Sequence, residues 1–187
     1  EGFLPLIFAA GSLDEKGAVQ ELLEGSIRYA TELGERLRDR VYEYVVPNLA
    51  VGVANELERL GQGDDLDAAY RITLKILFRL LFQAYAEDQG LLPYNRNDRY
   101  TRNSLTTQAN DFVERPDREL DAGSHAIWDD LRQVWSVIDT GNSDWDVPAY
   151  NGGLFGTDPV FHPDGHVIDS MHLDDVAVGT ALRHLLT

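Results

Sequence analysis

The sequence predicts an all-α fold: an irregular helical bundle around a central apolar helix, with one long ordered loop rich in glycine and proline. Two observations predict it. Apolar residues recur at helical spacing through most of the 187 residues. No segment shows the sustained alternation of a strand, although Val160-Phe161 and Val167-Ile168 could pair briefly. The length suits one helical domain, residues 1–187, and the first residue, Glu1, suggests a piece of a longer chain.

The first predicted unit spans residues 14–60 and resembles a helical hairpin. Its apolar residues repeat every three or four positions up to Val46. Pro47 lacks an N–H group, so we expect it to break or kink the helix there. A shorter helix follows and ends at Leu60, before the glycines of residues 61–63.

The central helix is predicted over residues 64–90. Asp64, Asp65 and Asp67 suit a helix N-terminus, because carboxylates accept hydrogen bonds from the first amides. The second half of this helix is apolar almost all round, which is typical of a helix in the middle of a bundle. Gly90 and Pro93 then prevent its continuation.

The remaining segments alternate between helices and polar loops. Residues 94–104 read as a polar loop, and residues 104–141 as further helices, one capped by Ser124 and ended by Gly141. Residues 142–172 are predicted to form the ordered loop, because a structureless run of that length is uncommon in a compact domain. The last predicted helix covers residues 173–187.

Within the ordered loop, Leu154 and Phe155 are the predicted anchors, supported by Trp145 and Tyr150. We expect at least one glycine of the pair at 152 and 153 to have a positive φ, so that the chain can turn tightly.

The charge of the chain is strongly acidic. It carries 32 acidic and 16 basic side chains, a net charge of −16, and only two of the bases are lysines. This composition indicates a salt-loving source. In molar salt the Debye length is about 3 Å, so the net charge does not exclude contact with DNA and only local clusters matter.

Other features of the composition exclude several classes of protein. The chain has no cysteine, which excludes disulfides, cysteine-based zinc sites and thiol nucleophiles. No apolar run reaches the roughly 20 residues of a membrane span, and the apolar residues 3–10 lack a basic flank. We therefore expect a cytoplasmic protein with no membrane partner.

The familiar catalytic motifs are also absent. There is no glycine-rich phosphate loop, no Gly-x-Ser-x-Gly and no His-Glu-x-x-His, and Pro116-Asp117 lacks the Glu-x-Lys of a nuclease site. Imidazole and carboxylate side chains do gather between residues 162 and 172, which suits a divalent metal but matches no closed template. They are His162, Asp164, His166, Asp169 and His172. The alternative, which we favour, is a polar loop before a helix whose N-terminus is stabilised by acidic side chains.

The most basic window lies at residues 96–103. Its arginines, Arg96, Arg99 and Arg102, are interleaved with tyrosine and asparagine and are candidates for contacts with DNA phosphates. A solvated loop whose arginines pair with nearby acids is the alternative.

Two further charged groups lie on the central helix. One group has four-residue spacing and consists of Arg71, Lys75 and Arg79. Like charges at this spacing repel one another unless they have partners. We expect carboxylates as the partners, with a nucleic-acid backbone as the alternative. Glu87 and Asp88 lie at the C-terminal end, where the helix dipole disfavours acids. Adjacent helical residues point about 100° apart, which favours a structural tie over a catalytic carboxylate pair.

Two stretches of the chain, residues 77–93 and 148–155, resemble a known family. They are similar to the helical region that precedes the methyltransferase domain in large Type IIG restriction-modification enzymes and in related methyltransferases of BREX-type phage defence. The similarity covers residue 42 to the end. The matching landmark residues are Arg79, Tyr85, Glu87, Asp88, Tyr150, Asn151, Gly152, Gly153 and Phe155.

The resemblance implies a helical connector in a multidomain protein. Such proteins carry a nuclease or accessory region, the connector, an S-adenosylmethionine-dependent adenine-N6 methyltransferase domain and a target-recognition part. The Asn-Pro-Pro-Tyr motif and the cofactor loop are absent here, so no catalytic, cofactor-binding or metal-binding residue carries over.

The resemblance thus implies S-adenosylmethionine as a cofactor only for the parent protein. It implies the neighbouring methyltransferase and nuclease domains as partners of this chain, and DNA as a ligand bound through the parent protein. Two alternatives stay open: an acidic protein-interaction module with no DNA role, and a metal hydrolase using His162 and His166.

Overall fold

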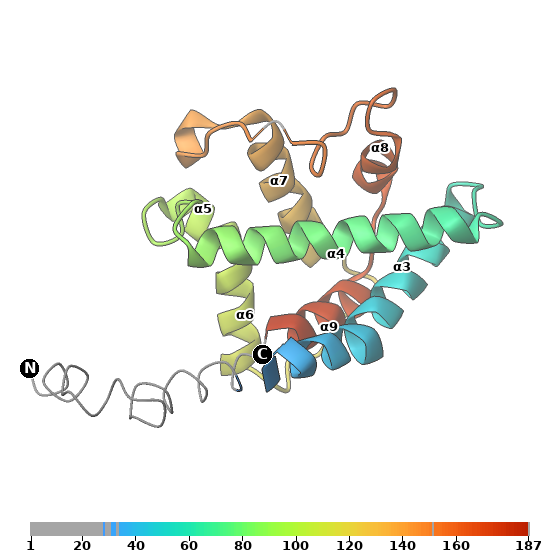
Figure 1. Ribbon diagram of the computed structural model, residues 1–187, viewed down its shortest axis with the longest axis horizontal. Coiled ribbons are helices and arrows are strands. Elements are labelled where there is room, and N and C mark those ends of the chain that lie inside the picture. Colours follow the sequence, from blue (N-terminus) through green and yellow to red (C-terminus); the bar gives the residue numbers. More distant parts are fainter. Residues whose placement is uncertain (1–27, 29–30, 33, 151, 187) are drawn as a thin grey trace, which may run out of the picture. The chain divides into compact units, whose positions relative to one another are not determined.

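The computed structural model describes residues 28, 31–32, 34–150 and 152–186. The chain divides into a unit of residues Glu1–Arg40, whose described part is helical, and a unit of residues Val41–Thr187 (Figure 1). The second unit contains every candidate site residue. Its described residues are mostly helical and form no strand, so the predicted all-α class is confirmed. Residues 14–27 of the first predicted helix lie outside the described residues.

The second unit begins with a π-helical turn, η2 (Val41–Val45), that leads directly into α3 (Val46–Arg59). Pro47 lies in the first turn of α3, directly after the π-helical turn η2. The predicted break at Pro47 does not occur, because the chain stays helical, but the change from π- to α-helical geometry just before Pro47 is a local distortion of the helix. Gly61 has a φ of 76° just beyond the end of α3.

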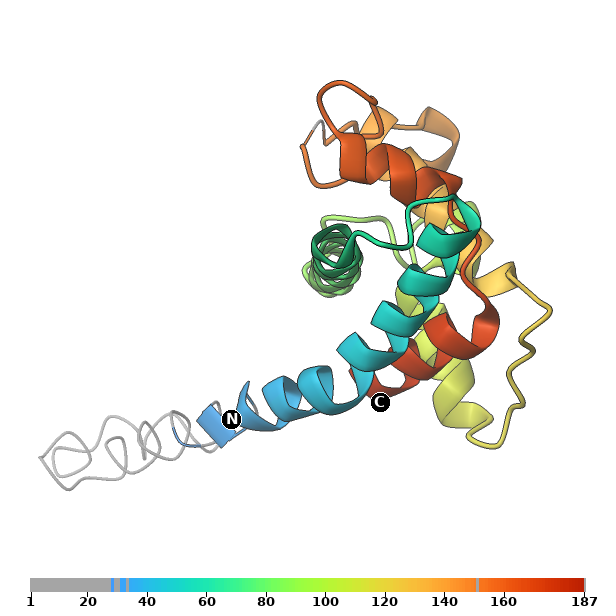
Figure 2. The same cartoon turned by 90° about the vertical axis from the view of Figure 1, so that its right-hand side faces the viewer.

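Helix α4 (Leu66–Asp88) is the longest described helix, and its limits agree with the prediction. The Asp65 carboxylate accepts a hydrogen bond from the Ala68 amide at 2.8 Å, and Gly90 beyond its end has a φ of 65°. The helix packs against α3, α6 and α8, described below. It is not enclosed on all sides, however: in Figure 2 it is seen end-on at one side of the unit.

Three helices follow α4: α5 (Asp98–Asn103), α6 (Leu105–Glu114) and α7 (Ala126–Thr140). The polar loop predicted for residues 94–104 is partly wrong, because the Asn97 side chain caps the short α5. The Ser104 side chain caps α6, which begins where a helix was predicted. Ser124 contributes only a 3.3 Å contact to the start of α7, whose Ile127 amide instead binds the Asp175 carboxylate at 2.9 Å.

Residues 142–172 contain more regular structure than predicted. They include a short 3₁₀ turn, η3 (Ser143–Trp145), and a helix, α8 (Pro163–Ser170), before α9 (Asp175–Leu186) completes the unit. Val167 and Ile168 belong to α8, so their suggested pairing with residues 160–161 is wrong. The segment still packs against the helices as expected, with Trp145 and Phe155 buried.

The prediction of a positive φ at the paired glycines fails at Gly153, which is not in the left-handed region. The close approaches occur at Gly156 and Gly165 instead. A Cβ atom at Gly156 would collide with the His162 ring, and one at Gly165 would collide with the Gly156 carbonyl oxygen. The chain therefore needs its small residues where α8 meets the loop.

Candidate functional site

The two stretches that carry the family resemblance contact each other through Arg79 of α4. Its side chain is 2% exposed, and it donates hydrogen bonds to the carbonyl oxygens of Leu154 at 2.8 Å and Phe155 at 3.2 Å. The guanidinium carbon also lies 5.1 Å from the ring centroid of Trp135 and 5.6 Å from that of Phe155. Arg79 thus fixes the loop on α4 and α7.

Burial lowers the pKa of Arg79 to about 10, and the charges of Asp139 and Asp169 oppose that shift. The group is still a cation at neutral pH. Because its direct partners are carbonyl oxygens and aromatic rings, its charge is balanced only by these more distant carboxylates.

A second set of contacts ties the same two stretches together. The Phe82 ring meets the Tyr150 ring edge-on at 5.9 Å and the Phe155 ring at 5.3 Å. The Tyr150 hydroxyl donates to the Leu91 carbonyl oxygen at 2.9 Å. The two stretches that carry the resemblance are therefore far apart in sequence but pack against each other. Asn151 lies outside the described residues.

Glu87 is the centre of a buried polar network. Its carboxylate accepts hydrogen bonds from the amides of Leu105 at 3.0 Å and Thr106 at 2.8 Å, the first residues of α6. The hydroxyls of Tyr100 and Thr106 donate to it as well, at 2.8 and 2.7 Å. Free amides at the start of α6 thus stabilise an acid that the end of α4 disfavours. The expected structural tie is confirmed for Glu87, whereas Asp88 is exposed.

Two further residues extend this network. Gln83 donates to Glu87 at 2.9 Å and accepts from the Trp135 indole at 3.0 Å. Burial raises the pKa of Tyr100, as do the charge of Glu87 and the hydrogen bond to it. Tyr100 is therefore a fixed hydrogen-bond donor at any ordinary pH. The network joins α4, α5, α6 and α7, and it shows no free nucleophile or base.

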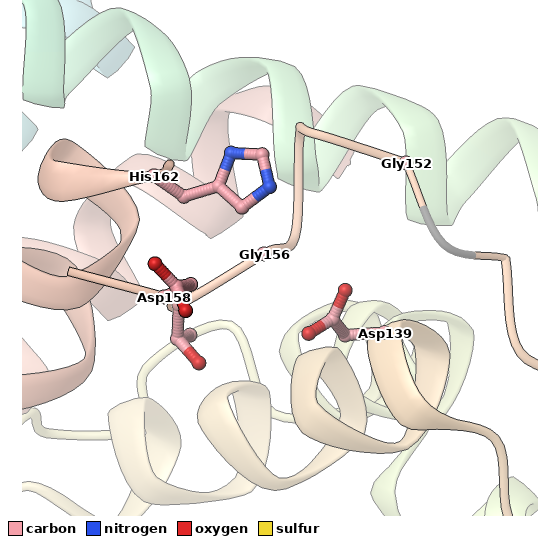
Figure 3. Close-up of a pocket in the computed structure, with 6 residues that line it drawn as sticks. Asp139, Gly152, Gly156, Asp158 and His162 are labelled. Atoms are coloured by element: carbon pink, nitrogen blue, oxygen red, sulfur yellow. The ribbon is translucent and has the colours of Figure 1, made fainter. Parts of the chain in front are cut away.

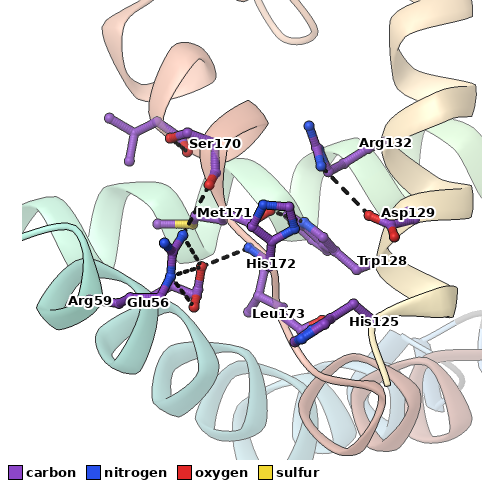
Figure 4. Close-up of polar contacts among 11 residues, drawn as sticks. Glu56, Arg59, His125, Trp128, Asp129, Arg132, Ser170, Met171, His172 and Leu173 are labelled. Atoms are coloured by element: carbon purple, nitrogen blue, oxygen red, sulfur yellow. Dashed lines mark hydrogen bonds and ion pairs between the residues drawn. The ribbon is translucent and has the colours of Figure 1, made fainter. Parts of the chain in front are cut away.

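A third polar centre holds the segment between α8 and α9 (Figure 4). Each residue from Ser170, the last of α8, to Leu173 is bound: Arg59 donates to the Ser170 carbonyl oxygen and Trp128 to that of Met171. Glu56 accepts from the His172 amide at 2.7 Å, and His125 lies 3.1 Å from the Leu173 carbonyl oxygen. The segment is thus fixed by α3, α7 and the residue before α7.

Glu56 itself is held in the charged form. Burial alone would raise its pKa, but hydrogen bonds from Arg59 and the His172 amide outweigh burial and bring the pKa below its ordinary value. No local sequence pattern indicates this role of Glu56, since the amide partner lies 116 residues away.

An open hollow of about 420 Å³ lies between α7 and the loop that precedes α8 (Figure 3). Its lining residues are Asp139, Gly152, Gly156, Thr157, Asp158 and His162. Asp158 accepts hydrogen bonds from the amides of Val160 at 2.8 Å and Phe161 at 3.0 Å, and these bonds lower its pKa. It therefore acts as a turn-forming carboxylate rather than a general acid.

The candidate metal ligands do not come together. Asp164 pairs with Arg71 at 3.4 Å and Asp169 with Arg132 at 3.5 Å, while the His172 amide binds Glu56. Within the described part of the chain there is no group of three side chains that could hold a metal ion. The metal hydrolase alternative, which used His162 and His166, therefore finds no ligand set there.

The three candidate DNA-contacting arginines each have a local partner. Arg96 donates to the Gly90 carbonyl oxygen at 2.7 Å, Arg99 pairs with Asp144 at 3.0 Å, and Arg102 donates to the Asp98 carbonyl oxygen at 3.0 Å. Arg96 helps to cap the end of α4. Arg99 and its partner are both largely exposed, so this pair is weak and exchanges with solvent.

The basic row on α4 has partners of two kinds. Arg71 pairs with the Asp164 carboxylate, as expected, whereas Arg79 binds carbonyl oxygens. Burial and the charge of Arg79 lower the pKa of Lys75, against the charge of Asp164. Internal contacts thus account for Arg71 and Arg79.

Comparisons of the chain with protein-family models, curated proteins and solved structures find no match. Among the described residues, no helix is both long and apolar enough to cross a membrane.

Proposed function

We propose that this chain is the helical connector of a multidomain, S-adenosylmethionine-dependent DNA adenine-N6 methyltransferase, with a restriction nuclease attached in some members, acting in phage defence. The connector performs no chemistry alone. It sets the spacing of the domains on either side and holds them rigidly.

The observation that supports this proposal most is the contact of Arg79 with the Leu154 and Phe155 carbonyl oxygens. It joins the two stretches on which the family resemblance rests. Glu87 and Tyr150, two other landmark residues, are also used in ties between segments. Residues that serve to fix helices and loops suit a scaffold, because a spacer must transmit position without bending.

The first test is the parent gene. The proposal expects an Asn-Pro-Pro-Tyr motif downstream in the same open reading frame, and methylation of adenine by the purified parent protein. A reading frame without that motif, or a parent without methyltransferase activity, would overturn it.

A second test uses this chain by itself. Because the cofactor loop is absent from the sequence, calorimetry with S-adenosylmethionine should give no measurable heat of binding. Micromolar binding by residues 1–187 would contradict the connector role.

The direct DNA contact is tested in the parent protein. Arg99→Ala and Arg102→Ala remove exposed cations without disturbing buried contacts, whereas Arg28→Ala, on the first unit, is a control of equal charge change. If α5 touches DNA phosphates, each α5 substitution reduces the salt dependence of DNA binding by about one unit of log–log slope. An unchanged slope assigns DNA contact to the other domains.

An acidic protein-interaction module without a DNA role is the second candidate, and the net charge of −16 favours it. The parent gene separates the two candidates, since this module needs no methyltransferase domain in its reading frame.

A further inference from the structure

Helix α4 carries apolar side chains along a face that the described part of the protein leaves open. Leu66 is 79% exposed, Tyr70 62%, Phe78 55% and Tyr85 60%. Leu74 and Leu81, both partly buried, lie between them in sequence. At about 100° per residue, all six fall within an arc of about 120°, and they extend along about 29 Å of the helix. We call these six residues the α4 stripe.

Four residues of the α4 stripe, Leu66, Tyr70, Phe78 and Tyr85, are exposed, whereas Leu74 and Leu81 between them also pack against the edge of the core. Ile72, Ile76 and Leu80, on the other side of the helix, are at most 1% exposed and supply the contacts with neighbouring helices. Single exposed apolar residues are ordinary on protein surfaces, but a continuous row is typical of an interaction site. In Figures 1 and 2 the helix lies across one side of the unit, with the other helices of the unit behind it.

The size of the stripe indicates what covers it. From the exposed fractions, its free area is on the order of 500 Å². A stable complex of separate proteins buries about 800 Å² on each partner, so the stripe alone is too small for one. Two domains of one polypeptide meet at an effective concentration in the millimolar range, and a smaller surface is then sufficient.

The charge of the chain supports the same occupant. In a pair of copies, the exposed carboxylates at the ends of one stripe would face those of the other, which opposes self-association. Exposed carboxylates lie at both ends of the stripe, Asp64 and Asp67 at one end and Asp88 at the other. A matching partner has an apolar face with arginine or lysine at its edges.

We infer that the α4 stripe is the docking surface for an adjacent domain of the same polypeptide, an inference that rests on the proposed connector function. The docking face is apolar at its centre and cationic at its ends. Tyr85, a landmark residue that is exposed on α4, is then explained by this contact.

Photo-crosslinking in the full-length parent protein tests the inference. Phe78→p-benzoylphenylalanine puts the reactive group on the stripe. Val113→p-benzoylphenylalanine is the matched control, because Val113 of α6 is 64% exposed and lies outside the stripe. Mass spectrometry of the irradiated parent should find an adduct between residue 78 and a segment outside residues 1–187 of the same polypeptide. Residue 113 should give none.

Three results would overturn the inference: an adduct between two copies, an adduct only with a different protein, or no adduct from residue 78 and none from Tyr85→p-benzoylphenylalanine. Methyltransferase activity is measured on the same samples. A parent that methylates DNA but gives no such adduct overturns the docking surface alone. An adduct in a parent without methyltransferase activity overturns the proposed enzyme and keeps the docking surface.

Thermal unfolding gives an independent measurement. Phe78→Lys and Tyr85→Lys change the melting temperature of the isolated chain little, since both side chains are mostly exposed there. In the parent, the same substitutions lower the melting temperature of this unit, because a charge replaces a covered apolar side chain. Equal effects in both proteins would show that no domain covers the stripe.

Discussion

Two buried charges, those of Arg79 and Glu87, are stabilised by direct hydrogen bonds to backbone groups. Arg79 donates to two carbonyl oxygens, and Glu87 accepts from two amides. Backbone partners have fixed positions, so such bonds specify geometry without the side-chain entropy that an ion pair between two long side chains must lose. Each of these residues thereby locks one segment at a defined place on α4.

Glu56→Gln tests one such charge through pH. The pKa of Glu56 is below its ordinary value in the folded protein, so the unfolded state binds more protons near pH 4. The stabilisation is complete above the unfolded pKa of about 4.3 and is lost as pH falls through the folded pKa. At pH 7 we expect a loss of about 1–2 kcal/mol in the free energy of unfolding.

The measurement for Glu56→Gln is urea unfolding from pH 7 to pH 3. The difference in the free energy of unfolding between the variant and the unsubstituted chain should shrink as the pH falls. Glu58→Gln, an exposed residue of the same helix, is the control and should change little at any pH. A difference that stays constant down to pH 3 would contradict a role for the charge.

Gly165→Ala tests the close approach of α8 to the loop. An ideal Cβ at this position would overlap with the Gly156 carbonyl oxygen, which belongs to the backbone and cannot rotate away. Alanine normally stabilises a helix interior, so its intrinsic effect is opposite in sign. We expect destabilisation of about 2 kcal/mol, because overpacking forces the backbone to shift.

Gly152→Ala is the control for Gly165→Ala, since its added Cβ would meet no atom closer than 3.8 Å. Both variants are compared by chemical denaturation. If alanine at 165 proves as stable as alanine at 152, α8 and the loop are not packed as described.

At the scale of elements, helices with clear periodicity and caps were predictable. α4, α6 and α7 have apolar residues at helical spacing, and Asp65, Ser104 and Gly141 mark their ends. The short helices were not predictable. α5 and α8 have 6 and 8 residues, too few turns for an apolar period to show, and tertiary contacts decide their state.

The candidate site, too, was predictable from the sequence only in part. The tie at Glu87 followed from an acid placed at the unfavourable end of a helix dipole. The partners of Arg79 could not be predicted, because carbonyl oxygens occur in every residue and carry no sequence signal. The exposed stripe of α4 was missed for a related reason: a helix that is apolar all round does not reveal which side its own chain leaves uncovered.

Glu87→Gln tests the junction of α4 with α6. Glutamine replaces one acceptor oxygen by a donor, which would then face the amide of either Leu105 or Thr106. We expect a loss of about 2–3 kcal/mol, because a buried donor is left without its charged acceptor. Hydrogen exchange at residues 105 and 106 should accelerate more than exchange in α7.

The control for this junction is Asp88→Asn, which changes an exposed carboxylate at the same helix end. It should be neutral or slightly stabilising, because an acid there opposes the helix dipole. If both variants unfold at the same urea concentration, the Glu87 network does not hold the two helices together.

For the whole molecule, the excess of 16 acidic side chains decides how stability responds to salt. Like charges on the compact folded state repel one another more strongly than on the expanded unfolded chain, so the repulsion is destabilising at low ionic strength. Raising the salt from about 10 mM to 1 M shortens the Debye length from about 30 Å to about 3 Å and removes most of that repulsion. The exposed ion pairs, such as Arg99 with Asp144, also weaken in salt, but each contributes at most about 1 kcal/mol. The buried ties of Arg79 and Glu87 are screened little. We therefore expect the melting temperature of the isolated chain to rise steadily from dilute buffer to molar KCl, as calorimetry can measure.

The same rise in tetramethylammonium chloride would identify screening as the cause, because screening depends on ionic strength and not on which cation is present. A flat or falling curve would show that the acidic surface is not destabilising, and it would remove the inference of a salt-loving source.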